Sequence, residues 1–274
     1  MEIDYYKRAY IGHLIRENVE RREVSLLGGE NASIRALKIK CLFDIERILN
    51  ISGWIRNKQN LYRSVATLKD YPPDFTFNVA KRSSETSIWF RNEYVKLIEK
   101  YDIFFDFDKS PDDSWEDLIK DVKSLKEYLD EYRVPYYLLF SGKKGFQIIV
   151  DGKYLPIEKI ELGNIYPHKL IIEKVKSMLN LKFLDLANNG ILSRLMKIPY
   201  SLVANGEENE QEMNMALPLD DVQFEHFRIE NMKVKNVLSS VKLVRRGNLE
   251  RFQELSFEDK KENLQKFISI FSFK

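Results

Sequence analysis

Apolar positions recur along the chain at two different spacings, which predict a mixture of helices and strands. The most regular pattern covers 115–132, where apolar residues stand three and four apart and charges occupy the opposite face, as in an amphipathic helix. Ser114 precedes this stretch and Asp117 follows three residues later, which is typical of a helix N-cap. The apolar positions are Trp115, Leu118, Ile119, Val122, Leu125, Tyr128, Leu129 and Tyr132.

Shorter apolar runs predict strands. The aromatic run at 101–107 predicts a buried strand, and two runs on either side of a turn at 141–145 predict a hairpin. The strands and helices do not alternate regularly, as they would in a doubly wound sheet, so the predicted fold class is α+β. Other predicted strands are 23–27, 62–68, 75–80, 136–140 and 146–150; further predicted helices are 170–179, 220–240 and 257–272.

The charge of the chain is nearly balanced. With 44 Lys and Arg against 42 Asp and Glu, the formal net charge is only +2. Any affinity for nucleic acid would therefore depend on a local basic groove, because cations act where they lie along a phosphate backbone.

Cysteine and histidine are too scarce for a zinc site. Cys41 is the only cysteine, which excludes an intramolecular disulfide and any cysteine-rich metal site, and there are three histidines. No apolar stretch reaches the roughly 18–20 residues that span a bilayer, and the N-terminus lacks the character of a signal peptide. We therefore expect a reduced, cytoplasmic protein without a membrane partner.

The first chemical signal is the acid pair Asp106 and Asp108 at the end of the aromatic run. Residues two apart on a strand share a face, so the two carboxylates project together. Like charges this close are costly unless a cation lies between them, and carboxylate oxygens are the ligands that Mg²⁺ and Mn²⁺ prefer. The alternative is that the strand ends earlier and both acids are solvated loop residues.

The second signal is the turn Ser141-Gly142-Lys143-Lys144-Gly145. Its glycines permit a tight turn whose backbone N–H groups receive phosphate oxygens, and its lysines add positive charge. The alternative is an ordinary hairpin whose lysines keep the tip soluble.

The third signal is Asp185, followed by Arg194 and Lys197 in a short apolar stretch that stops at Pro199. On a helical turn, Arg194 and Lys197 would share a face. The alternative is that Asp185 caps a turn and both cations are surface charges.

Taken in order, these segments resemble the catalytic (small) subunit of archaeal and eukaryotic DNA primases, in the archaeo-eukaryotic primase superfamily. That family has an acid pair ending a hydrophobic strand, then an SGRxGxH-type turn, then an acid followed by R/H-L-hydrophobic-K/R-x-P-x-S. The counterparts are FDFD ending at Asp108, SGKKGFQ from Ser141, and Asp185 followed by RLMKIPYSL from Arg194. Four earlier segments also resemble family segments in the same order: Tyr5-Tyr6-Lys7-Arg8, Arg22-Glu23-Val24-Ser25, Ser33-Ile34-Arg35 and Tyr62-Arg63-Ser64-Val65.

The resemblance implies a primase-type catalytic fold, with mixed sheets, flanking helices and an active site on the central sheet. It implies that Asp106, Asp108 and Asp185 hold two Mg²⁺ or Mn²⁺ ions for attack of a 3′-hydroxyl on the α-phosphate of a nucleotide. No cysteine lies between the first two motifs, so we expect no zinc insertion. The residues implied in nucleotide binding are Ser141, Lys143, Lys144, Gln147, Lys197 and, near the pocket, Glu23 and Arg35.

Two positions depart from the family pattern. Gln147 and Val203 stand where the family has histidines that touch phosphate. Glutamine still donates a hydrogen bond, whereas valine donates none. Weaker triphosphate binding, a changed nucleotide preference or a contact supplied by a partner would each follow.

The resemblance covers about 4–225, so we expect a catalytic domain at 1–225 and a helical segment at 226–274 that packs on the core or docks a partner. The implied partners are a single-stranded DNA template, nucleoside triphosphates and a large regulatory subunit with an iron–sulfur cluster. An archaeal or archaeal-element origin and a nucleoid location also follow from it. The alternatives to a primase or primase-polymerase are a repair or end-joining fill-in polymerase, and a non-catalytic, primase-like nucleic-acid-binding subunit.

Overall fold

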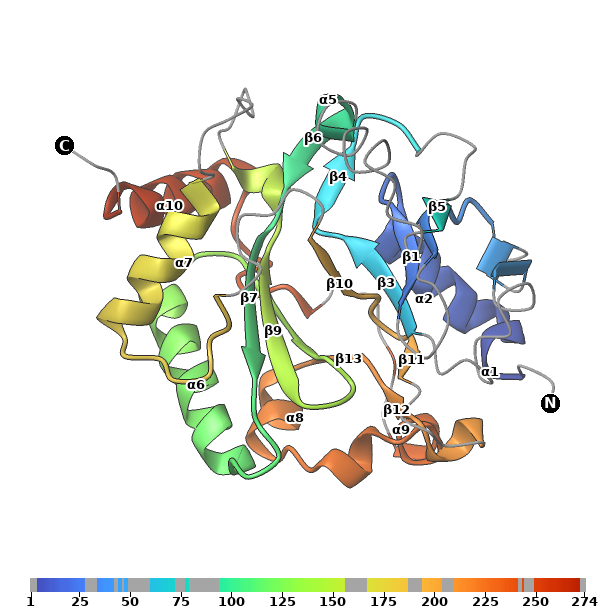
Figure 1. The fold of residues 1–274 in the computed structure, drawn as a ribbon. Helices are drawn as coiled ribbons and strands as arrows, with labels where there is room; N and C mark the ends of the chain where they lie inside the picture. The colour runs from blue at the N-terminus through green and yellow to red at the C-terminus, as the bar shows by residue number, and fades with distance from the viewer. Residues whose placement is uncertain are drawn as a thin grey trace.

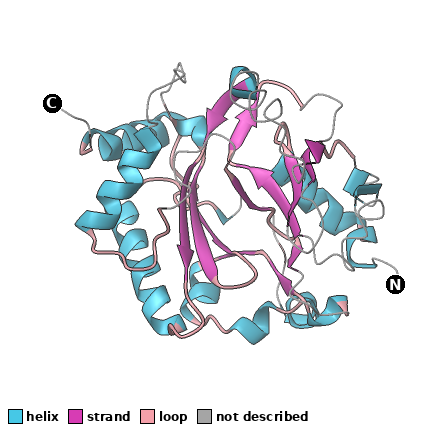
Figure 2. Cartoon of the chain, viewed as in Figure 1, coloured by secondary structure: helices cyan, strands magenta, loops and turns pink. Residues whose placement is uncertain are grey.

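Two sheets face each other across the middle of the molecule, and helices cover their outer sides (Figures 1 and 2). Wherever the strands of the described chain pair, they pair antiparallel, in agreement with the α+β class. This computed structural model describes residues 4–27, 34–41, 44–45, 47–48, 60–71, 77–78, 94–155, 167–186, 194–203, 209–240, 243 and 249–271.

The first sheet, here called the carboxylate sheet, has the strand order β13-β8-β9-β7. Strands β7 and β9 pair along their whole length, from Ile103 opposite Val150 to Asp108 opposite Gly145. Side chains alternate between its two faces, so one face is wholly apolar while the other carries Asp106. The bounds are β7 Ile103–Asp108, β8 Tyr137–Phe140, β9 Gly145–Val150 and β13 Leu217–Leu219.

Helices α6, α7 and α10 lie on the outer side of the carboxylate sheet (Figure 1). Phe105 and Phe107 of β7 belong to the same buried cluster as Leu118 and Leu125 of α6, so the amphipathic face of this helix is its sheet-facing side. The Ser114 hydroxyl accepts a hydrogen bond from the Asp117 N–H at 3.0 Å, which confirms the predicted helix start. The bounds are α6 Trp115–Glu131, α7 Pro167–Met178 and α10 Phe257–Ser269.

The second sheet, here called the N-terminal sheet, has the order β10-β3-β1-β2-β5. Helix α2 buries Ile11, Leu14, Ile15 and Val19 in the same cluster as Val24 of β1. The bounds are α1 Asp4–Lys7, α2 Ala9–Val19, β1 Val24–Leu27, β2 Ile34–Leu37, β3 Asn60–Ser64, β5 Phe77–Asn78 and β10 Leu195–Lys197.

A separate apolar cluster lies where the two sheets meet. It combines Phe104, Tyr137 and Ile149 from the carboxylate sheet with Met196 from β10 and Val65, next to β3. Each sheet therefore buries the inner face of the other. Asp106 and Lys197 lie at the end of this interface, between the two sheets.

Two of the predicted strands are each broken in two. The run at 101–107 divides at Asp102 into β6 (Ile98–Tyr101) and β7, and the run at 62–68 divides at Val65 into β3 and β4 (Ala66–Leu68). Strands β4 and β6 form a small sheet of their own. Asp102 leaves the strand pattern because its carboxylate is buried in an ion pair with Arg22, a partner that sequence periodicity does not reveal.

The predicted helix at 220–240 is a chain of short elements, and of the predicted strand at 75–80 the described part is β5 alone. Gly28-Gly29, a pair that predicts a turn, lies outside the described residues. Leu264 and Phe267 of α10 are buried in the main core, and the expected boundary between 225 and 226 stays a prediction. The remaining bounds are α5 Val95–Leu97, η2 Gly152–Tyr154, β11 Leu202–Val203, η3 Glu210–Glu212, β12 Asn214–Met215, α8 Asp221–Glu225, η4 Ile229–Met232 and α9 Val234–Ser240.

Among the helices that the structure describes, none combines the length and the apolar character that crossing a membrane requires.

Candidate active site

Strand β7 presents two carboxylates on its inner face. Asp106 is 8% exposed, and Asp108, at the end of the strand, is partly exposed. Phe105 and Phe107 point to the opposite face and are fully buried there, so packing fixes the strand and with it the direction of both acids. The strand continues through Asp108, so the reading of these acids as loop residues beyond the strand is wrong.

Asp185 is brought to the same surface by backbone pairing. The Asp185 N–H donates to the Asp106 carbonyl at 2.8 Å, and the Asp108 N–H donates to the Phe183 carbonyl at 3.1 Å. Between them Leu184 forms an antiparallel bridge to Phe107. Residues opposite each other in such a pairing share a face, so Asp185 lies beside Asp106 although 79 positions separate them in sequence.

Arg194 lies between these two acids. Its Nη2 is 2.6 Å from Asp106 Oδ2 and 4.0 Å from Asp185 Oδ2, and its side chain is 14% exposed. The backbone after Arg194 is strand β10, so the expectation that Arg194 and Lys197 share a face of a helical turn is wrong. Sequence reasoning assigned Arg194 no contact with the acids, because only the tertiary fold brings β10 to β7.

The acids have a mutual effect on protonation. Burial and, after it, the nearby charge of Asp108 raise the pKa of Asp106 to about 6, although Arg194 and a hydrogen bond from Gln147 act in the opposite direction. A carboxylate whose ionised form is disfavoured in this way gains from a bound cation.

The glycine–lysine turn joins β8 to β9 beside these acids. The Ser141 hydroxyl donates to the Gly145 carbonyl at 3.0 Å, so it closes the turn itself. Gly142 has φ +88°, a conformation that favours glycine. Lys143 and Lys144 are exposed, and Lys144 Nζ lies 2.8 Å from Asp108 Oδ2.

Gln147 and Val203 occupy different places in the site. Gln147 lies opposite Asp106 in the β7–β9 register, and its Nε2 donates to Asp106 Oδ1 at 3.1 Å. Val203 is buried against the turn, because a Cβ added at Gly142 would collide with its side chain. The first residue therefore supports an acid, and the second supports the turn by packing.

The opposite wall of the site is the N-terminal sheet. Lys197, Tyr62 and Ser25 lie in one row across β10, β3 and β1, and Lys197 Nζ is 4.2 Å from the centre of the Tyr62 ring. Burial, followed by the charges of Asp106 and Asp108, raises the pKa of Tyr62 to about 12. Tyr62 therefore lies within electrostatic range of the acids, a role that its place in the sequence did not indicate.

Lys197 is buried and lies near the turn. Burial lowers its pKa to about 7, and the charge of Lys143 contributes to the same shift. Glu23 is also buried and accepts a hydrogen bond from the Ser25 hydroxyl at 3.0 Å. Arg35 belongs to β2, and its side chain lies outside the described structure.

The donor chemistry of the three acids fits a hard divalent cation, since carboxylate oxygens are the ligands that Mg²⁺ and Mn²⁺ take. As the structure stands, no group of three or more His, Cys, Asp or Glu side chains within the described residues is close enough to hold one ion. Arg194 and Lys144 are paired with the same carboxylates. A metal bound here would have to compete with these side chains.

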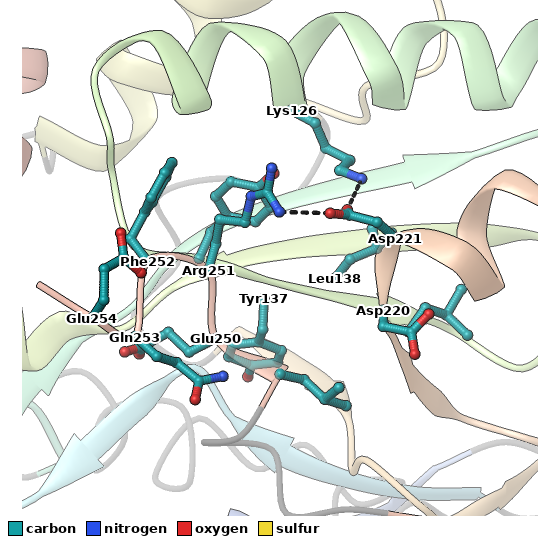
Figure 3. Close-up of a pocket in the computed structure, with 13 residues that line it drawn as sticks. Lys126, Tyr137, Leu138, Asp220, Asp221, Glu250, Arg251, Phe252, Gln253 and Glu254 are labelled. Carbon is teal, nitrogen blue, oxygen red and sulfur yellow. Dashed lines mark hydrogen bonds and ion pairs between the residues drawn. The ribbon is translucent and has the colours of Figure 1, made fainter. Parts of the chain in front are cut away.

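A cavity of about 300 Å³ lies away from the acids, at the β8–β13 edge of the carboxylate sheet. Figure 3 shows Lys126 from α6 and Arg251 reaching Asp221 from two directions, with distances of 2.6 Å each. Its lining contains none of the residues that the sequence singled out for catalysis or nucleotide binding.

The fold is similar to that of a solved polymerase domain. The solved polymerase domain of Mycobacterium tuberculosis ligase D in complex with DNA matches it with a TM-score of 0.56 and 10% sequence identity, over 89% of this chain and 89% of that one. Primase RepB′ matches with a TM-score of 0.39 and 9% identity, over 95% of this chain and 67% of that one, a score too low to indicate a shared fold. No family model and no curated protein matches the sequence.

At 10% identity, the first match shows a shared fold and no more. The expected mixed sheets and flanking helices are thereby supported as a fold. Membership of the small-subunit type stays a prediction.

Proposed function

We propose that this chain is a DNA-directed nucleotidyltransferase, a primase or primase-polymerase, that adds nucleotides to a 3′-hydroxyl opposite a DNA template. Asp106, Asp108 and Asp185 would hold two Mg²⁺ or Mn²⁺ ions. The observation that carries the proposal is the backbone pairing of Asp185 with Asp106, which places three acids on one surface. Metal bound there would lower the pKa of the attacking hydroxyl and neutralise charge on the phosphates.

The chain itself would position the triphosphate. Lys197 lies on the wall opposite the acids, and Lys143 is close enough to lower its pKa, so two cations converge from different elements. Such a cluster attracts phosphate oxygens, and Lys144 extends it toward Asp108. Ser141 and Gly142 hold the backbone of the turn in the shape that faces the ligand.

Gln147 would act on an acid as well as on the nucleotide. Its hydrogen bond to Asp106 fixes one carboxylate oxygen, and the other oxygen, which is paired with Arg194, would take the cation. Glu23, which directly precedes β1, and Arg35, on β2, would belong to the nucleotide pocket, as the family resemblance implies.

The experiment is a primer-free incubation with single-stranded template, labelled nucleotides and Mn²⁺. We expect incorporation by the wild type and a loss of about 10³-fold or more in Asp106→Ala, since several kcal/mol of transition-state stabilisation depend on the metal. Asp112→Ala is the matched control, because it removes an exposed aspartate from the loop that follows. Equal incorporation by wild type and Asp106→Ala would contradict the proposal.

A fill-in polymerase is the second candidate, because one structural match is the polymerase domain of a ligase in complex with DNA. The same assay separates the two. De novo products indicate a primase, whereas products formed only when a primer is supplied indicate extension. Template binding without products in either format would indicate a non-catalytic subunit.

The remaining expectations belong to the same proposal. The segment 226–274 would pack on the catalytic domain through α10, in line with the burial of Leu264 and Phe267. A large regulatory subunit with an iron–sulfur cluster would be a partner, and the nucleoid would be the location. No zinc would be required.

A further inference from the structure

The three acids are already balanced by two side-chain cations. Arg194 lies 2.6 Å from Asp106 and 4.0 Å from Asp185, and Lys144 lies 2.8 Å from Asp108. The five groups leave one net negative charge. The site is therefore nearly neutral before any metal binds, although it consists of three carboxylates on one surface.

A metal and Arg194 would compete for the same atoms. Asp106 Oδ2 accepts a hydrogen bond from the Arg194 guanidinium, and Asp106 Oδ1 accepts one from Gln147. A divalent cation needs these oxygens as ligands, so it enters only when the guanidinium withdraws. The same reasoning applies to Lys144 at Asp108, where a hydrogen bond to the carboxylate raises the pKa of the lysine.

Arg194 is held in this place by the acids and by little else. Its Nε is buried and makes no hydrogen bond within the described part of the chain. Its guanidinium carbon lies 5.5 Å from the centre of the Phe104 ring, a weak contact. An unsatisfied buried N–H costs free energy, so the position of Arg194 depends on the charge of Asp106 and Asp185.

A triphosphate offers both cations a new partner. The guanidinium fork matches phosphate oxygens as well as it matches a carboxylate, and the long stem of lysine swings easily. Lys144 is more than half exposed and lies next to Lys143, on the turn proposed to receive the phosphates. Both cations can therefore exchange the acids for phosphate oxygens at no net loss of charge pairing.

We propose that Arg194 and Lys144 are exchangeable counterions of the three acids, which pass to the phosphates of the nucleotide as divalent metal takes their place. Metal and nucleotide binding are then coupled: each raises the affinity for the other by the same factor. This inference rests on the proposed function, since it requires both ligands at this site. It assigns Arg194 and Lys144 a role in controlling metal entry.

The test measures Mn²⁺ binding directly, by electron paramagnetic resonance of free Mn²⁺, without DNA so that no turnover occurs. Each protein is titrated alone and with a non-hydrolysable deoxynucleoside triphosphate, with binding of Mn²⁺ to the nucleotide subtracted. The variants are Arg194→Gln and Lys144→Gln. Arg133→Gln and Lys123→Gln are matched controls, because each removes a cation from an exposed ion pair, with Glu254 and Glu225 respectively.

In the wild type we expect the nucleotide to tighten Mn²⁺ binding by about 5- to 150-fold, the usual range of coupling between two ligands. Arg194→Gln binds Mn²⁺ alone more tightly than the wild type, and its coupling to nucleotide is smaller. Lys144→Gln changes in the same direction by a smaller factor, because its pair with Asp108 is more exposed. Both controls match the wild type.

Unchanged or weaker Mn²⁺ binding in both Arg194→Gln and Lys144→Gln overturns the inference and leaves the proposed function intact. Mn²⁺ binding that survives Asp106→Asn at wild-type affinity places the metal elsewhere and overturns the proposed function itself. Circular dichroism melts establish that each variant folds. Lys144→Gln keeps the test decisive if Arg194→Gln does not fold, because Lys144 is exposed and makes no core contact.

Discussion

Arg22 and Asp102 form a buried ion pair that joins the two sheets, with Nη2 3.0 Å from Oδ2 and both side chains at most 6% exposed. Asp102 stands at the break between β6 and β7, and Arg22 immediately precedes Glu23. Arg63, fully buried, approaches the same carboxylate at 3.6 Å and donates to the Tyr137 hydroxyl. The pair therefore connects β7, which carries Asp106 and Asp108, to the N-terminal sheet, which carries Lys197.

We expect Asp102→Asn to lower the free energy of unfolding by about 3–5 kcal/mol, because it leaves two buried guanidinium groups without a compensating charge. Urea denaturation at pH 7 measures the change. Glu225→Gln is the control, since it breaks an exposed pair with Lys123 and should leave the free energy of unfolding nearly unchanged. A loss below 1 kcal/mol in Asp102→Asn would show that the ion pair is not a main contact between the sheets.

The turn between β8 and β9 depends on Gly142. Its φ of +88° strains any other residue, and an added Cβ would collide with Val203. We expect Gly142→Ala to destabilise the protein by about 1–3 kcal/mol and to weaken nucleotide binding, as measured by thermal melts and titration with a fluorescent nucleotide. Val203→Ala in the same chain removes the closer contact, with Cγ2, but leaves the Cβ contact at 3.0 Å and the backbone strain, so it restores only part of the loss. Full recovery would mean that the backbone strain is negligible.

Removal of charge at Asp106 should stabilise the metal-free protein. Its pKa in the folded state is about 6, against 3.8 when unperturbed, so the folded state binds the extra proton and loses stability as pH rises through 4–6. Asn mimics the protonated acid and still accepts from Gln147. We expect Asp106→Asn to gain about 1–3 kcal/mol at pH 7 in EDTA and to lose the stabilisation that Mg²⁺ gives the wild type.

Scanning fluorimetry with EDTA and with Mg²⁺ checks both parts of this expectation, with Asp112→Asn as the exposed control. A lower melting temperature of Asp106→Asn in EDTA would show that the pairing with Arg194 outweighs the cost of burying the charge.

Nucleotide affinity should depend on the protonation of Lys197. With a pKa lowered to about 7 by burial and by Lys143, this side chain loses its charge as pH rises from 6 to 8. We expect affinity for a non-hydrolysable nucleotide to fall by up to about tenfold over that range in the wild type. The arginine of Lys197→Arg keeps its charge over this pH range, so the nucleotide affinity of this variant should fall less. The ratio between the two proteins cancels the titration of the nucleotide, and parallel profiles would contradict the prediction.

The sequence by itself determined the local elements and the order of the candidate chemistry. The spacing in 115–132 predicts α6, and Ser114 marks its start, because helix periodicity and capping are local properties. The period of two in β7 placed Asp106 and Asp108 on one face for the same reason. Strand breaks at Asp102 and Val65 escaped prediction, since each depends on a partner distant in the chain.

Only the tertiary structure decided which charges meet. Asp185 pairs with Asp106 through the backbone, although 79 positions separate them, and Arg194, directly before β10, contacts both acids. Neither contact can be predicted from neighbouring residues in the sequence. Burial, which moves the pKa of Asp106 and of Lys197, exists only once the two sheets have packed. The residue types in the sequence indicate which chemistry is possible. How the charges interact depends on the distances between segments far apart in the chain and on the burial that their packing causes.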